Sequence, residues 1–178
     1  MKRTIKHIFY ILSITIMLAS CASEASLQHY FVDNQESSNF ISQDIPISMV
    51  KLDKSHFSEE QNEAFNSVKR LNFLGYKVSE AKTFKTELAK VKTILKDKKY
   101  NDLMEFNDKG RKIIVKYVGT DDEADEVIVF GSSKDLGFGI IRVLGNDMSP
   151  DKMVTLITAL QKADIDESQV ENLMNFFK

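Results

Sequence analysis

Four short segments between positions 101 and 144 constrain the fold of this 178-residue chain more than any other feature. They are Asn101–Phe106, Lys112–Val118, Glu126–Gly131 and Phe138–Leu144, and the last three are rich in β-branched or aromatic residues. The connectors between them are short and rich in turn-forming residues: Asn107–Gly110, Thr120–Asp125 and Ser132–Gly137. Because connections this short can join antiparallel but not parallel strands, the pattern predicts an antiparallel β-meander.

The second of these segments indicates how the two faces of the sheet should differ. Ile113, Val115 and Tyr117 fall on one face, whereas Ile114, Lys116 and Val118 fall on the other. We therefore expect one apolar face and one face of mixed polarity.

The rest of the chain alternates between further strands and amphipathic helices. Strands are predicted at Phe40–Ile45, ended by Pro46, and at Leu74–Val78, while Ile47–Leu52 stays ambiguous. Helices are predicted at Glu59–Arg70 after the capping box Ser58–Gln61, at Ala81–Lys96, from Pro150 after the N-cap Ser149, and from about Glu167 with Val170, Leu173, Met174 and Phe177 inward. These elements predict a single α+β domain, an antiparallel sheet covered by amphipathic helices.

The first twenty residues are typical of a secretory signal. The basic residues Lys2, Arg3 and Lys6 precede Ile8–Leu18, an uncharged and mostly apolar run. A membrane-spanning helix needs about 20 apolar residues, so this run is too short for a conventional span. We expect residues 1–20 to be a cleaved signal peptide.

The end of that signal resembles the lipobox of bacterial lipoproteins. Leu18, Ala19 and Ser20 would be recognised by the signal peptidase, and Cys21, the only cysteine of the chain, would receive the lipid. The resemblance implies a covalent acyl anchor on Cys21 and no other cofactor. Two or three acyl chains hold a protein firmly at a membrane. The alternative is an ordinary signal peptide with an incidental cysteine.

The residues after Cys21 bear on location and domain limits. Residues 21–29 are predicted to be the lipidated cysteine and a tether, and residues 30–178 the α+β domain. Ala22 stands where an aspartate commonly retains lipoproteins at the inner membrane, which favours the outer membrane by analogy. We expect the domain to face the periplasm, although Glu24 leaves export to the cell surface open.

The charge balance argues against nucleic acid as a partner. Residues 1–20 hold three of the 24 basic residues and none of the 26 acidic ones, so the processed chain carries a net charge of about −5. Binding to nucleic acid requires a basic surface. The expected partners are the membrane, through the lipid, and another envelope protein.

Three stretches of the chain carry a family resemblance: Tyr30–Glu36, Phe40–Pro46 and Tyr100–Met104. They resemble lipoproteins of the Bacteroidota known as domain of unknown function 4252. The resemblance implies a small envelope lipoprotein of Gram-negative bacteria. It brings no activity, ligand or catalytic residue that could be transferred to this sequence.

Candidate catalytic and metal-binding residues are few. The carboxylates of Asp121, Asp122, Glu123, Asp125 and Glu126 could hold Ca²⁺, but the segment lacks an EF-hand pattern and is more typical of a solvated turn. His56 lies beside Asp53, Glu59 and Glu60 and could act as a base or metal ligand, but it is more typical of a solvated residue just before a helix. His29 is the other histidine after the signal, and the segment Gly131–Ser133 lacks a nucleophile elbow. The composition therefore favours a non-catalytic protein.

One basic surface is also predicted. Lys82, Lys85, Lys90, Lys92 and Lys96 lie on the polar side of their helix, where they could meet anionic lipid headgroups or simply contact solvent. The leading hypothesis is a lipid-anchored binding or sensing module that contacts another envelope protein through loops such as Asp121–Glu126 and Ser132–Asp135. The alternatives are a carrier of a small apolar ligand, which requires an apolar cavity, and a hydrolase.

Overall fold

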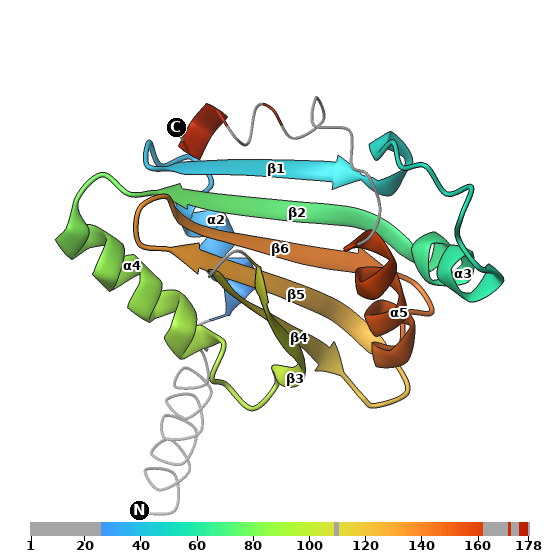
Figure 1. The fold of residues 1–178 in the computed structure, drawn as a ribbon. Helices are drawn as coiled ribbons and strands as arrows, with labels where there is room; N and C mark the ends of the chain where they lie inside the picture. The colour runs from blue at the N-terminus through green and yellow to red at the C-terminus, as the bar shows by residue number, and fades with distance from the viewer. Residues whose placement is uncertain (1–25, 109–110, 162–170, 172–174, 178) are drawn as a thin grey trace, which may run out of the picture.

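The fold is a six-stranded antiparallel sheet with helices on both faces (Figure 1). The computed structural model describes residues 26–108, 111–161, 171 and 175–177. The strands are β1 (Phe40–Pro46), β2 (Val68–Lys77), β3 (Asn101–Asp108), β4 (Arg111–Gly119), β5 (Ala124–Ser133) and β6 (Gly137–Gly145). The helices are α2 (Leu27–Asn34), the short 3₁₀ helix η1 (Ile47–Met49), α3 (Glu59–Ser67), α4 (Ala81–Ile94) and α5 (Pro150–Leu160). The predicted α+β class is confirmed.

The strand order is β1-β2-β6-β5-β4-β3, so the four strands predicted as a meander do form consecutive hairpins. The β5–β6 turn depends on Gly137, whose φ is +127°. A side chain there would collide with the carbonyl oxygen of Tyr76 on β2. Glycine therefore allows the hairpin to lie close against the neighbouring strand.

The helix predicted at Glu59–Arg70 is wrong at its carboxyl end. The capping box at Ser58 starts α3 as expected, but the helix stops at Ser67 and β2 begins at Val68. From there the backbone pairs with β6, with Leu71 opposite Val143. Apolar residues at helical spacing continue into β2, and long-range strand pairing overrides that local pattern.

The packed domain begins earlier than the predicted start at Tyr30. Helix α2 begins at Leu27, capped by the side chain of Ser26, and Leu27 is buried. The amide of Leu27 donates a hydrogen bond to the Tyr100 hydroxyl at 3.1 Å. The predicted tether of residues 21–29 is therefore shorter at its carboxyl end, because these contacts hold Leu27 and its neighbours against the domain.

One face of the sheet is closed by α2 and α4. Its core residues from the sheet are Leu74, Tyr76, Ile128, Phe130, Phe138 and Ile140, and those from the helices include Leu27, Phe31, Phe84, Val91 and Ile94. Aromatic rings fill the centre, where Tyr76 and Phe138 stack with centroids 5.1 Å apart. We call this the closed face.

The opposite face is covered by α3 and α5 near the end of the sheet where β5 begins (Figure 1). There the sheet contributes Val115, Tyr117 and Val127, and the helices contribute Ala64, Phe65, Met153 and Leu156. We call this the half-covered face. Its other end, toward the β5–β6 turn, carries the cavity described below. In the described part of the chain, no helix is long and apolar enough to cross a membrane.

Candidate functional site

A row of glycines hollows the half-covered face beyond α3 and α5. Gly75 on β2 pairs with Gly139 on β6, which in turn pairs with Gly131 on β5. Directly paired residues of an antiparallel sheet point to the same face, so three adjacent strands contribute no side chain of their own along this row. The rings of Phe73 and Phe177 cover Gly75, and the hollow lies over Gly139 and Gly131. Ile113 on β4 closes the row as the partner of Gly131. Glycine inside a strand often marks a place where a ligand approaches the backbone.

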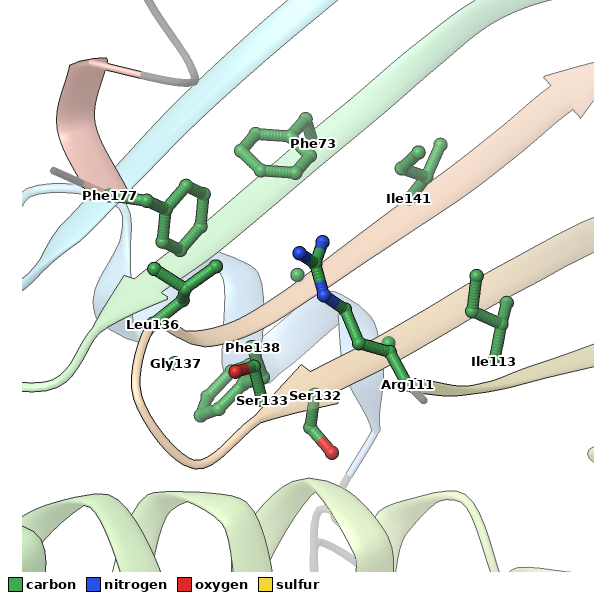
Figure 2. Close-up of a pocket in the computed structure, with 12 residues that line it drawn as sticks. Phe73, Arg111, Ile113, Ser132, Ser133, Leu136, Gly137, Phe138, Ile141 and Phe177 are labelled. Carbon is green, nitrogen blue, oxygen red and sulfur yellow. The ribbon is translucent and has the colours of Figure 1, made fainter. Parts of the chain in front are cut away.

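Apolar side chains wall this hollow on several sides (Figure 2). Phe73 and Ile141 face each other two positions along β2 and β6 from the glycines. Phe177 lies at the other side, because a Cβ built on Gly75 would lie 2.9 Å from the Phe177 ring. Leu136, on the β5–β6 turn, completes the lining and is 37% exposed. We call this site the glycine-floored groove.

The groove encloses a cavity of about 440 Å³. Ligand pockets typically measure about 300 to 1,000 Å³ and are mainly apolar with a few polar groups. Three polar side chains belong to the lining residues here: Arg111, Ser132 and Ser133. Figure 2 shows the guanidinium of Arg111 reaching inward from β4, between Ile141 and Leu136. The site can therefore accept an apolar group and place one cation beside it.

Polar groups on the closed face serve a different purpose. Glu126 accepts two hydrogen bonds from Arg142, at 2.6 Å to Nε and 3.0 Å to Nη2, and both side chains are largely buried. The Arg142 guanidinium also lies 5.4 Å from the Phe31 ring centroid, so it joins β6 to α2. The hydrogen bond with Glu126 raises the pKa of Arg142. This pair holds the helix on the sheet, and neither residue lines the groove.

A second polar contact joins the two helices of the closed face. The Tyr30 hydroxyl of α2 donates a hydrogen bond to Glu87 of α4 at 2.8 Å. Burial, together with this hydrogen bond and the nearby carboxylate, raises the pKa of Tyr30 well above its usual 10.0. The hydroxyl therefore stays protonated and acts as a structural donor.

The five carboxylates predicted as a possible Ca²⁺ site do not share one position. Asp121 accepts a hydrogen bond from the Tyr117 hydroxyl at 2.7 Å, which raises the pKa of Tyr117. Glu126 turns away to Arg142, Asp122 and Glu123 are exposed on the β4–β5 turn, and Asp125 is exposed on β5. Among the residues described by the structure, no group of three or more acidic, His or Cys side chains is arranged to hold a metal ion.

The histidines are also distant from the groove lining. His56 is exposed in the loop before α3, where the carboxylate of nearby Asp53 accepts a hydrogen bond from the Ser55 amide at 2.9 Å. That hydrogen bond is the main cause of a lowered pKa of Asp53, and the charge of His56 adds to it. His29 is exposed and its Nδ1 lies 3.2 Å from the Ser26 hydroxyl. Neither histidine lines the cavity.

The other predicted residues fall into two groups. Leu18, Ala19, Ser20 and Cys21 lie outside the described residues. The five lysines of α4 and its carboxyl end are exposed, and Lys90 pairs with Glu87 at 2.7 Å. Of the predicted partner loops, Ser132 and Ser133 line the groove, whereas Asp121 is on the turn at the other end of β5.

Sequence reasoning missed the groove itself. Gly75, Gly131 and Gly139 each lie within a strand or at the end of a predicted one, and the signal was their presence in segments that otherwise favour β-branched residues. The alignment of the three glycines depends on the register of three strands. The family resemblance named no site that would have pointed to it.

Comparison with known protein families identifies the family of this chain. A family described as Domain of unknown function (DUF4252) matches residues 30–156, well over half of the chain. No curated protein and no solved structure matches the chain. The matched segment includes all six strands and therefore most of the groove lining.

Proposed function

Since the chain belongs to the family described as domain of unknown function (DUF4252), we propose its role from its own residues: it is a lipid-anchored, non-catalytic envelope protein that binds an apolar ligand in the glycine-floored groove. The observation that carries this proposal is the cavity of about 440 Å³ between Phe73, Ile113 and Ile141. Burial of apolar area contributes roughly 25 cal/mol per Å², so such a lining can retain a small apolar molecule.

Among the floor glycines, Gly131 supports binding over a purely structural role, whereas Gly75 and Gly139 make room for the Phe73 ring, which lies 2.9 and 3.3 Å from a Cβ built at these two positions. A glycine within a strand is destabilising by roughly 0.5 to 1 kcal/mol relative to alanine. Gly131 is not required by space, because a Cβ there would meet only the Ile113 side chain, at an ordinary 3.7 Å. The fold would accommodate a larger residue at this position. A cavity that glycine keeps open at position 131 is consistent with a bound ligand.

The anchor places this groove at a membrane. Lipidation of Cys21, recognised through Leu18, Ala19 and Ser20, is supported by the lipobox at the end of the signal. Six residues from Cys21 to Ser26 can span at most about 20 Å, so the folded domain would stay close to the lipid surface. We propose the outer membrane, facing the periplasm, as its location. Apolar ligands are abundant at such a surface.

The anchor is tested separately from the groove. Cys21→Ala should abolish incorporation of radiolabelled palmitate and leave unprocessed precursor, because the acceptor thiol is gone. Incorporation of label into the variant would show that the lipobox interpretation is wrong.

A protein partner is the second candidate, and one observation favours it. Strand β1 is at an edge of the sheet, and its outer side pairs with no strand in the described chain. Exposed edge strands can add a strand from another protein. The earlier expectation of contact with another envelope protein would be met in this way, with the groove accepting an apolar side chain of the partner.

One crosslinking experiment separates the two candidates. A photoreactive residue replaces Leu136 on the groove rim, with Val32 as the matched position on α2, where the side chain is 60% exposed. A small ligand would give low-mass adducts at position 136 but not at position 32. A protein-sized adduct at position 136 would instead favour the partner. No specific adduct at position 136 would contradict both candidates.

A further inference from the structure

Arg111 differs from the other arginines that the structure describes. Arg70 pairs with Asp44 at 3.4 Å, and Arg142 pairs with Glu126. Arg111 forms no hydrogen bond or ion pair through its side chain with any described residue. It nevertheless belongs to the lining of an apolar cavity. A cation in that position has no described counter-ion.

The backbone directs Arg111 to the groove. Alternate residues of a strand share a face, so Arg111 points to the same side as Ile113, which closes the glycine row. The neighbouring Lys112 points to the opposite side and pairs with Glu105 at 2.7 Å. Figure 2 shows the Arg111 side chain turned over the sheet toward the other lining residues. Its charge is therefore available beside an apolar surface.

A hydroxyl donor lies on the same rim. The Ser133 side chain accepts a hydrogen bond from the Asp135 amide at 3.3 Å, which leaves its own proton available to donate. Arg111 and Ser133 both belong to the groove lining. A guanidinium forms paired, charge-assisted hydrogen bonds with a carboxylate more readily than a lysine does.

We propose that the ligand is an amphiphile with a single carboxylate, such as a fatty acid. Its head group binds Arg111, and its chain lies over Gly131 and Gly139 against Phe73 and Ile141. This inference rests on the proposed function, which requires only that the groove bind an apolar ligand. It adds a charge requirement that an uncharged apolar ligand would not meet.

The test compares decanoate with decanol, which share a chain and differ in the head group. Each competes with a fluorescent dansyl fatty acid for the full-length processed protein in detergent below the micellar concentration. We expect decanoate to bind at least tenfold more tightly than decanol, since hydrogen bonds to charged groups are the stronger ones. Arg111→Gln should lower decanoate affinity about tenfold and leave decanol affinity unchanged. Lys112→Gln is the matched control, because it removes the same charge one residue away on the other face, and it should change neither affinity.

The outcomes separate this inference from the proposed function. Equal binding of decanoate and decanol, both unaffected by Arg111→Gln but lost in Gly131→Val, would overturn the carboxylate while the apolar groove remains. An equal loss of decanoate affinity in Arg111→Gln and Lys112→Gln would also overturn it, because general surface charge would then explain the effect. Binding of neither ligand would contradict the proposed function itself.

Discussion

The two faces of the sheet are built from alternate residues of the same strands, yet they differ in how completely they are filled. On β5 and β6 the closed face receives Ile128, Phe130 and Ile140, all at most 2% exposed. The half-covered face receives Gly131 and Gly139 at the corresponding places. We infer that side chains on the closed face contribute most of the folding stability. The part of the half-covered face that forms the groove contributes less, because it lacks such buried side chains.

Truncation of one aromatic residue on each face should reveal this difference most strongly. Phe130→Ala removes a ring that is 2% exposed, and we expect a loss of about 3 to 5 kcal/mol in the free energy of unfolding. Phe73→Ala removes a half-buried ring of the groove and should cost about 1 kcal/mol. Urea unfolding followed by circular dichroism measures both. Equal losses of stability would show that the groove residues stabilise the fold as much as the closed-face core does.

The buried ion pair of the closed face offers the next largest effect. Glu126→Gln leaves the Arg142 guanidinium largely buried without its counter-charge, and we expect a loss of about 2 to 4 kcal/mol. Asp44→Asn breaks the exposed pair with Arg70 and should change stability by less than about 0.5 kcal/mol. Thermal unfolding of both variants compares the two pairs. A small loss of stability in Glu126→Gln would mean that water solvates the Arg142 guanidinium in the folded protein.

Alkaline pH should weaken the closed face through Tyr30. Its pKa is raised by folding, so the unfolded chain loses this proton near pH 10.0 while the folded protein keeps it. The free energy of unfolding should therefore be unaffected below pH 10 and fall above it, by about 1 kcal/mol over the first pH unit. Tyr30→Phe should remove that part of the decline.

Tyr76 contrasts with Tyr30 in its contacts, because its buried hydroxyl has no hydrogen-bond partner among the described residues. At neutral pH, Tyr76→Phe should leave stability unchanged or raise it by about 1 kcal/mol, since an unsatisfied buried hydroxyl is removed. Thermal unfolding measures this change, and a clear loss of stability in Tyr76→Phe would contradict the expectation.

Filling the groove should have the smallest effect on stability. Gly131→Val adds a β-branched side chain at a position where a Cβ fits, so the free energy of unfolding should change by less than about 1 kcal/mol. Gly137→Val is the contrasting variant, because its Cβ would collide with the Tyr76 carbonyl and should destabilise the protein strongly. A large loss in Gly131→Val would mean that the row of glycines is needed for folding.

The fold could be predicted from sequence where the signals were local. Turn residues between the meander strands, the capping box at Ser58 and the Ser149–Pro150 start of α5 each identified an element without knowledge of its neighbours. The boundary at Val68 was missed because strand pairing with β6 decides it. The predicted helix from Glu167 lies largely outside the described residues, although Phe177 is described and lines the groove.

The candidate site could not be predicted for the same reason. Gly75, Gly131 and Gly139 are separated along the chain and become neighbours only through the register of β2, β6 and β5. Arg111 could not be identified from the sequence either. It differs from the other described arginines in lying beside an apolar surface without a described partner, and only the structure shows this. The weak candidates from the sequence, Asp121–Glu126 and His56, were considered because their polar residues are close in sequence.

The most direct test of the account is a backbone amide NMR titration of the isotopically labelled protein with decanoate. We expect saturable shifts concentrated at Gly131 and Gly139 and at the neighbouring amides of the β5–β6 turn, with the closed-face amides of α2 and α4 little changed. Shifts concentrated between α2 and α4, or no saturable shifts in a protein that remains folded, would contradict the claim that the glycine-floored groove is the binding site.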